Sequence, residues 1–335
     1  MRVLVTGGTG FIGSHFTRRL LEGGHKVNLV VHRTRPEQPE GPSVKHVSCD
    51  LEDPTLFRNA GFKCDMAVNM AGLLRKPGIR DESYWKVHYE STKHILEEAA
   101  KFKMKHVLLM STTGVYGATG RTPRTEEGPC QPGDIYERTK LEGERYAMEQ
   151  CPQDGVELTI ARPGLVYGPG DLHLLRLFRG IKGGWFRIVG DGSNLIHPIY
   201  IDDLTEALMR CLPAGGPARP VETRPQPRVF NLAGERPVAF GEFCEVIARA
   251  VGRKRLPSMR IPKGLASAAG GAFELAYKLT RIRPPLTRET VEFMTSDRAY
   301  DISKARRVLE WSPSIGIEEG TRRAVAWYRE KGLLN

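Results

Sequence analysis

Length, composition and charge describe an ordinary globular protein. The chain has 335 residues, of which 40% are hydrophobic and 27% charged, enough for one large α/β domain and a smaller one. Its formal net charge is +11, and residues 251–335 hold 17 Lys and Arg against 9 Asp and Glu. No nucleic-acid-binding motif accompanies this charge, so we expect a solvated basic surface and no nucleic-acid partner.

The first half of the chain alternates short apolar runs with helical patterns, as repeated strand–helix units do. We expect strands at Arg2–Thr6, Lys26–His32, Val44–Cys49, Met66–Met70, Val107–Ser111 and Leu158–Ala161. We expect helices from about Gly10 to Glu22, at Glu82–Lys101 and at Ile135–Glu149. Consecutive units of this length predict an α/β fold over residues 1–170, with a doubly wound parallel sheet of the Rossmann type.

The pattern changes after about residue 170. Pro213–Arg228 is rich in proline and arginine and predicts a surface loop. Helices are expected at Phe240–Val251, Gly264–Arg281 and Ile317–Lys331. We interpret residues 171–335 as a smaller, discontinuous substrate-binding lobe, part of which returns to the sheet. This lobe would cover the crevice beyond the strand ends, where open α/β sheets bind ligands.

Glycines shape the turn between the first strand and the first helix, which reads Gly7-Gly8-Thr9-Gly10-Phe11-Ile12-Gly13. Gly7 permits a tight turn, Gly10 lets the backbone approach a pyrophosphate, and Gly13 lets helix and strand pack closely. The helix N-terminus offers N–H groups to the anion. We therefore predict a dinucleotide site that includes Gly7, Gly10, Phe11 and Ile12. The alternative is an ordinary strand–helix turn.

The residues after the second strand indicate which dinucleotide is preferred. An acid there would accept hydrogen bonds from the ribose 2′-hydroxyl and repel a 2′-phosphate. This chain has His32-Arg33-Thr34-Arg35 instead, with no acid before Glu37. The basic cluster favours NADP over NAD, with His32 and Arg33 as contacts, unless the arginines only begin a solvated loop.

Three further strand ends supply candidate cofactor contacts. Asp50 follows the third strand, where its carboxylate would accept the adenine amino group beside the backbone of Leu51. Asp50 would otherwise cap a helix that begins near Pro54. Ala71 follows the fourth strand, and Ser111 ends the fifth.

Tyr136 and Lys140 lie four residues apart on the helix expected at 135–149, so their side chains share one face. A nearby ammonium stabilises a phenolate and lowers the pKa of the tyrosine, which suits Tyr136 to general acid–base chemistry. Such pairs are common on surfaces, but here Ser111-Thr112-Thr113 ends a strand at the crevice. We therefore predict Thr112, Tyr136 and Lys140 as the catalytic residues.

These motifs together resemble the extended short-chain dehydrogenase/reductase superfamily of NAD(P)-dependent epimerases, dehydratases and 3β-hydroxysteroid-dehydrogenase-like enzymes. The resemblance also rests on the Ser111–Gly117 run, on Arg162–Pro169 and on Tyr200-Ile201-Asp202-Asp203, in the family's order over nearly the whole chain. It implies that Thr112 hydrogen-bonds the reacting oxygen, that Tyr136 exchanges the proton and that Lys140 holds the nicotinamide ribose. Pro163 would contact the nicotinamide end.

Some positions depart from the family's pattern. Relatives often carry Asn where this chain has His88. His88 would therefore either take a functional role of its own or be a histidine on the helix surface without a role. Thr113-Gly114 stand where related dehydratases have an Asp-Glu pair, which argues against dehydration. Leu165 and Ile196 stand where epimerases place Asn and Arg on a diphosphate. This disfavours a nucleotide sugar, unless cations nearby compensate: Arg176, Arg179, Lys182 or Arg187.

The substrate class follows from these departures and from one further similarity. Residues 283–287, Arg-Pro-Pro-Leu-Thr, are similar to members that act on hydroxysteroids, isoprenoids and flavonoid-like ketones. The apolar segment before them would wall a substrate pocket, touch an anionic membrane surface or form an ordinary packed helix. We expect hydride transfer between nicotinamide and a secondary alcohol or ketone on a bulky, sterol- or isoprenoid-like molecule. A nucleotide-sugar epimerase and a non-catalytic NAD(P)-binding regulator are the alternatives.

Cysteine usage and the N-terminus bear on compartment and partners. The six cysteines are scattered, without a Cys-x-x-Cys pair or a Cys/His cluster, which argues against disulfides and a bound metal. Met1 runs directly into the first strand and no apolar stretch approaches a membrane span, so we expect a cytoplasmic protein. The resemblance implies a homodimer through Glu82–Lys101 and Ile135–Glu149.

Overall fold

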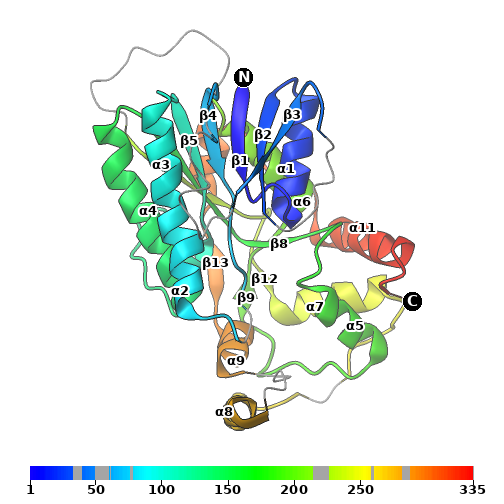
Figure 1. Cartoon of the computed structure of the whole chain (residues 1–335). Coiled ribbons are helices and arrows are strands. Elements are labelled where there is room, and N and C mark those ends of the chain that lie inside the picture. Colours follow the sequence, from blue (N-terminus) through cyan, green and yellow to red (C-terminus); the bar gives the residue numbers. More distant parts are fainter. Residues whose placement is uncertain are drawn as a thin grey trace.

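Seven parallel strands form the central sheet, in the order β11-β7-β5-β4-β1-β2-β3 (Figure 1). The computed structural model describes residues 1–32, 40–49, 60, 62–75, 78–213, 226–257, 260–280 and 287–334. The strands are β1 (Arg2–Thr6), β2 (Lys26–Val31), β3 (Val44–Ser48), β4 (Met66–Asn69), β5 (His106–Met110), β7 (Glu157–Pro163) and β11 (Arg228–Leu232). β1 lies between β4 and β2, so the strand order reverses beside it. A ligand crevice is expected at such a point.

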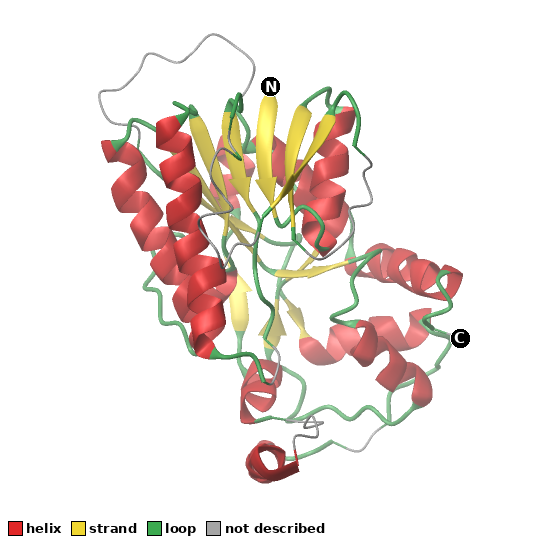
Figure 2. Ribbon diagram, viewed as in Figure 1, coloured by secondary structure: helices red, strands yellow, loops and turns green. Residues whose placement is uncertain are grey.

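Helices cover both faces of the sheet (Figure 2). The three central residues of β1 are apolar because both faces of the strand are buried: Val3 and Val5 join one core, and Leu4 joins the core on the opposite face. The first core lies under α1 (Phe11–Glu22) and α6 (Ile201–Arg210), and the second lies under α3 (Ser91–Lys101) and α4 (Ile135–Gln153). The fold class predicted from the sequence is therefore confirmed.

The helix expected at 82–101 is interrupted. It begins as α2 (Asp81–Tyr84), continues as a π-helical segment, η2 (Trp85–Glu90), and becomes α3 at Ser91. A π-helical turn holds one more residue than an α-helical turn and is frequent at functional sites. The segment packs against α4, the helix that carries Tyr136.

The lobe beyond the sheet is built from helices and very short strands. Its helices are α5 (Leu175–Gly183), α7 (Phe240–Ala250), α8 (Lys263–Thr280), α9 (Arg288–Thr295) and α11 (Ile317–Glu330), whereas α10 (Ser303–Val308) returns to the sheet and packs beside β11. Its strands pair as β8 (Leu165–Tyr167) with β10 (Pro198–Tyr200), β9 (Leu195–Ile196) with β12 (Val238–Ala239), and β6 (Gly120–Arg124) with β13 (Arg298–Tyr300). A short 3₁₀ helix, η3 (Thr113–Tyr116), follows β5. None of the described helices is long and apolar enough to span a membrane.

The predicted end of the loop at Pro213–Arg228 lies too late in the chain. Arg228 already begins β11, which pairs in parallel with β7 at the edge of the sheet. Phe230 and Leu232 are buried there, because they complete the core on the side of α1 and α6. Residues 214–225 of that segment lie outside the described part of the chain.

Candidate active site

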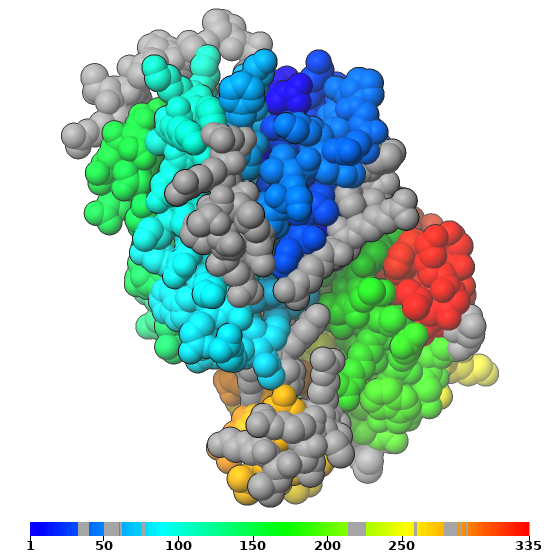
Figure 3. All heavy atoms as spheres, viewed as in Figure 1, coloured from blue at the N-terminus to red at the C-terminus, as the bar shows by residue number. Residues whose placement is uncertain are grey.

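A cleft of about 2590 Å³ lies between the carboxyl ends of the strands and the lobe. In Figure 3 a furrow separates the cyan residues of α2 and α3 from the green residues of the lobe. Most of the predicted site residues line this cleft: Gly7, Gly10, Phe11, Ile12, His32, Ala71, Ser111, Thr112, Tyr136, Lys140 and Pro163. The other three, Arg33, Asp50 and Leu51, lie outside the described residues.

The glycine turn leaves room at the start of α1. Gly7 has φ +67°, and a Cβ on it would overlap the carbonyl of Met70. A Cβ on Gly13 would overlap the Gly7 carbonyl. Gly10 is the N-cap residue and provides no side chain to the first N–H groups of the helix. The backbone around this turn therefore forms an open cradle of N–H donors that suits an anion.

Ser111 gives independent support for a bound group. Its hydroxyl is buried at the cleft wall without a hydrogen-bond partner among the described residues. A buried hydroxyl without a partner costs free energy unless a ligand or water satisfies it. Together with the cradle around Gly10, this fits a dinucleotide bound along the strand ends.

Thr112 and Tyr136 meet at the centre of the cleft. Oγ1 of Thr112 accepts a hydrogen bond from the Gly114 amide at 3.0 Å, and the Thr112 hydroxyl is hydrogen-bonded to Tyr136. Burial raises the pKa of Tyr136 above its ordinary value, although Arg75 and Thr112 counteract this in part. Tyr136 therefore holds its proton at neutral pH in this structure.

Lys140 is buried and contacts backbone carbonyl groups, and its action on Tyr136 stays a prediction. Its Nζ donates hydrogen bonds to the carbonyl oxygens of Ala71 and Met110, each at 3.0 Å. Burial lowers the pKa of Lys140 to about 8. The cation that lowers the pKa of Tyr136 is Arg75, whose guanidinium carbon lies 5.7 Å from the centre of the tyrosine ring.

His88 is buried, so the alternative that it is a histidine on the helix surface is wrong. Its Nε2 accepts a hydrogen bond from the Leu73 amide at 2.9 Å, which leaves the ring proton on Nδ1. Nδ1 lies 2.8 Å from Oγ1 of Thr139, and the ring packs edge-on against Tyr136. Burial, reinforced by the charge of Lys140, lowers the pKa of His88 to about 2. His88 therefore supports the helix of Tyr136 and the loop after β4 as a neutral residue.

Four charged residues beside Tyr136 were not identified from the sequence: Arg75, Asp134, Glu137 and Arg298. Arg75 comes from the loop after β4, the two acids from the start of α4, and Arg298 from β13. No local pattern joins these segments. The position of Glu137 next to Tyr136 was the only signal available.

Comparisons with known proteins show the family of this chain. The model of the NAD dependent epimerase/dehydratase family matches residues 3–233. The 2-alkyl-3-oxoalkanoate reductase of Stenotrophomonas maltophilia is 29% identical over 97% of this chain and 99% of its own length. The decarboxylating sterol-4-alpha-carboxylate 3-dehydrogenase of Saccharomyces cerevisiae is 25% identical over 98% of each chain.

Among solved structures, the UDP-glucuronic acid 4-epimerase from Bacillus cereus in complex with NAD superposes with a TM-score of 0.76. It is 20% identical and covers 100% of both chains, which supports the fold. Because the family model spans most of the chain, this protein belongs to the NAD dependent epimerase/dehydratase family and is an enzyme of the extended short-chain dehydrogenase/reductase type.

Proposed function

We propose that this protein is a dehydrogenase or reductase that acts on a secondary alcohol or ketone carried by a bulky apolar molecule. The observation that supports this most is the composition of the cleft wall. The lobe supplies it with apolar side chains: Leu172, Leu177, Trp185, Phe186, Val189, Phe240, Phe243, Ile261 and Met294. Leu172 and Trp185 are 62% and 58% exposed there, as expected of residues that await an apolar ligand.

A nucleotide sugar is the second candidate, and the cleft is less well suited to it. Leu165 and Ile196 line the cleft and offer no polar group to a diphosphate. Arg179 and Lys182 are directed instead to the carbonyl oxygens of residues 333 and 334. Arg176 and Arg187 do line the cleft, and they are the residues that favour an epimerase.

The names of the two relatives support a more specific substrate. The bacterial relative is a reductase of 2-alkyl-3-oxoalkanoates, and the yeast relative is a 3-dehydrogenase of sterol-4-alpha-carboxylates. Both names place the reacting oxygen function at carbon 3 and a carboxylate nearby. An apolar body with a carboxylate near the reacting carbon fits a cleft that is apolar along the lobe and charged beside Tyr136.

The side chains at the centre of the cleft suit proton transfer to such a substrate. A bound nicotinamide dinucleotide supplies or accepts the hydride. Thr112 and Tyr136 would donate hydrogen bonds to the substrate oxygen, and the proton held by Tyr136 would neutralise the alkoxide as it forms. Because burial raises the pKa of Tyr136, the resting enzyme is prepared as a proton donor, which is the state that ketone reduction needs. Lys140 would hold the nicotinamide ribose after exchanging a carbonyl contact for it.

We further propose that NADP is preferred over NAD. His32 lines the cleft at the end of β2, and no acid stands there to repel a 2′-phosphate. Calorimetric titration with both nucleotides tests this directly. Tighter binding of NAD than of NADP would contradict the preference.

The activity is tested by turnover of long-chain secondary alcohols with NADP⁺, followed at 340 nm. Tyr136→Phe should lower the rate by roughly 10²–10⁴-fold while leaving the affinity for NADP⁺ within about twofold, because only the exchangeable proton is lost. Tyr146→Phe is the matched control, since Tyr146 lies on the same helix away from the cleft. Thermal shifts with UDP-sugars but not with apolar alcohols would favour the epimerase instead.

A further inference from the structure

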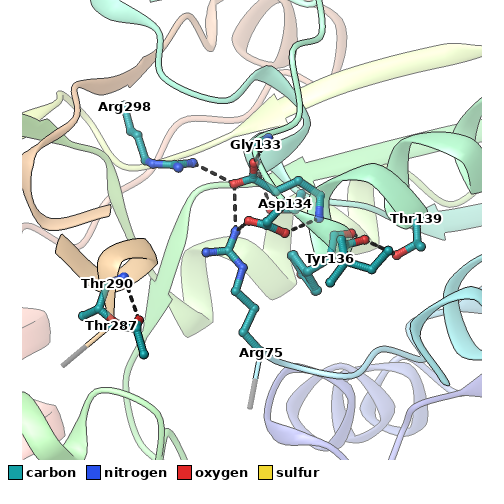
Figure 4. A network of polar contacts seen from close by, with 12 residues as sticks. Arg75, Gly133, Asp134, Tyr136, Thr139, Thr287, Thr290 and Arg298 are labelled. Carbon is teal, nitrogen blue, oxygen red and sulfur yellow. Dashed lines mark hydrogen bonds and ion pairs between the residues drawn. The ribbon is translucent and has the colours of Figure 1, made fainter. Parts of the chain in front are cut away.

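Two arginines from opposite parts of the molecule meet beside the catalytic tyrosine. Figure 4 shows Arg75 and Arg298 approaching the start of α4 from two sides, next to Tyr136. Nη2 of Arg75 and Nη1 of Arg298 donate hydrogen bonds to the same oxygen, Oε1 of Glu137, at 3.0 and 3.1 Å. Arg75 also pairs with Asp134. The two guanidinium groups are therefore held at fixed positions.

The two acids of this cluster already have structural partners. Asp134 caps α4 by accepting a hydrogen bond from the Glu137 amide at 2.9 Å. Oε2 of Glu137 accepts a hydrogen bond from the Gly133 amide at 2.7 Å, and the Glu137 side chain is only 2% exposed. Both acids also line the cleft, with side chains that are 16% and 2% exposed, and their contacts with the arginines orient the guanidinium groups.

Arg75 is the most exposed of the four charged residues that line the cleft here. The side chain of Arg75 is 28% exposed and that of Arg298 is 12% exposed, and both line the cleft. The guanidinium carbon of Arg75 lies 5.7 Å from the centre of the Tyr136 ring. Because Arg75 is more exposed than either acid, an anion beside Tyr136 would contact Arg75 more readily than it would contact a carboxylate. A planar guanidinium binds a carboxylate through two parallel hydrogen bonds, a geometry that a neutral ester cannot match in strength.

We propose that Arg75, oriented by Asp134 and Glu137 and supported by Arg298, binds a carboxylate of the substrate next to the reacting carbon. This inference rests on the proposed function and names its substrate class as 3-hydroxy and 3-oxo acids. Such an acid places its carboxylate carbon two bonds from the carbon that carries the oxygen. The oxygen can then lie on Thr112 and Tyr136 while the carboxylate lies on Arg75.

The reaction at this site balances without a further reagent. In the oxidative direction the phenol of Tyr136 first releases its proton to solvent. R–CH(OH)–CHR′–COO⁻ then loses a hydride from carbon 3 to the oxidised nicotinamide and its hydroxyl proton to the Tyr136 phenolate. The product is the 3-oxo acid R–CO–CHR′–COO⁻, with the carboxylate unchanged on Arg75. Reduction is the reverse of the same steps.

The probes are 2-hexyl-3-hydroxydecanoic acid and its methyl ester, each assayed with NADP⁺ and titrated by calorimetry in its presence. The wild-type protein should prefer the acid. In Arg75→Met, kcat/KM and affinity for the acid should fall by about 10- to 100-fold, with changes below about threefold for the ester. Arg75→Lys should be intermediate because it keeps the charge without the planar pair of donors. Arg145→Met, which removes an exposed arginine of α4 outside the cleft, controls for long-range charge.

The outcomes separate this inference from the proposed function. Equal losses for acid and ester in Arg75→Met would mean that the cluster only holds the lobe to α4, and would overturn the carboxylate site. A wild-type protein that oxidises the ester as well as the acid would do the same and leave the dehydrogenase activity intact. If Arg75→Met does not fold, this wild-type comparison alone decides. Failure of the wild type to bind or oxidise either compound would overturn both proposals.

Discussion

The sheet half and the lobe of this protein meet at one cleft but are built in different ways. In the sheet half, strands such as β1 are buried on both faces, and the turn after β1 cannot accept a single additional carbon at Gly7 or Gly13. In the lobe, every described strand except β6 has only two or three residues, and Trp185 and Leu172 stand exposed along the cleft. The proposed nucleotide side is therefore closely packed around its turn, whereas the proposed substrate side leaves apolar side chains exposed to the cleft.

The largest effect is expected from a substitution in the closely packed turn after β1. In Gly7→Ala the new methyl group would overlap the Met70 carbonyl at a positive φ, so the turn after β1 and the chain after β4 must separate and nucleotide binding should be lost. Calorimetry with NADP⁺ measures this. Gly24→Ala is the matched control, because Gly24 also has a positive φ but has nothing within 4 Å of its Cβ position. Unchanged binding in Gly7→Ala would remove the turn from the nucleotide site.

A second prediction concerns the interior of the sheet half. Arg162 and Glu144 form an ion pair at 2.5 Å with side chains 4% and 0% exposed, and Arg162 also donates to the Tyr116 hydroxyl at 2.7 Å. Arg162→Met leaves Glu144 as a buried charge without its partner and should lower the free energy of unfolding by about 3–5 kcal/mol. Arg322→Met, at an exposed pair with Glu319, should cost less than about 1 kcal/mol. Urea denaturation compares the two, and equal costs would contradict the argument from burial.

Substitutions of His88, which lies between the loop after β4 and the start of α4, should have a smaller effect, and this effect is on kcat. His88→Asn can still reach Thr139 but not the Leu73 amide, whereas His88→Gln can reach Leu73 and loses Thr139. If support of the loop after β4 matters more, kcat should fall by about tenfold in the Asn variant and less in the Gln variant. The reverse order would assign the effect to Thr139 and α4.

His88 also has a pH signature. Its pKa falls from 6.5 to about 2 on folding, so the unfolded state binds more protons between these values. Wild-type stability should therefore decrease as pH falls below about 6.5, and His88→Gln should decrease less steeply. Urea denaturation at pH 7, 6 and 5 measures the difference. Parallel curves would show that His88 is protonated in the folded protein.

The smallest expected effect on stability lies in the lobe. Trp185→Ala should change the free energy of unfolding by less than about 1 kcal/mol, because the indole is 58% exposed. It should nevertheless weaken binding of an apolar alcohol by about tenfold, and leave NADP⁺ affinity unchanged. Phe62→Ala removes an aromatic ring that is 54% exposed outside the cleft and should leave both affinities unchanged. A loss of NADP⁺ affinity in Trp185→Ala would contradict the assignment of the lobe to the substrate and of the sheet half to the nucleotide.

Sequence patterns located most of the sheet half. Six strands and the helices of α1 and α4 were predicted within a few residues, because apolar runs and glycine turns are local signals. β11 was missed because its strand character depends on pairing with β7, a segment far away in the chain. Eleven of the predicted contact residues lie in one cleft. Their roles toward the cofactor are predictions that the binding experiments above address.

The sequence alone determined that a strand, a glycine turn and a helix begin this protein, and that Tyr136 and Lys140 share a helix face. Both follow from spacing within a few residues. The tertiary structure decided what surrounds the phenol. It buried His88 in a π-helical segment, turned Lys140 toward two backbone carbonyls, and brought Arg75 and Arg298 to Glu137. Burial and charge around a side chain depend on chain segments that sequence spacing does not connect, and these set the pKa of Tyr136 and the polarity beside it.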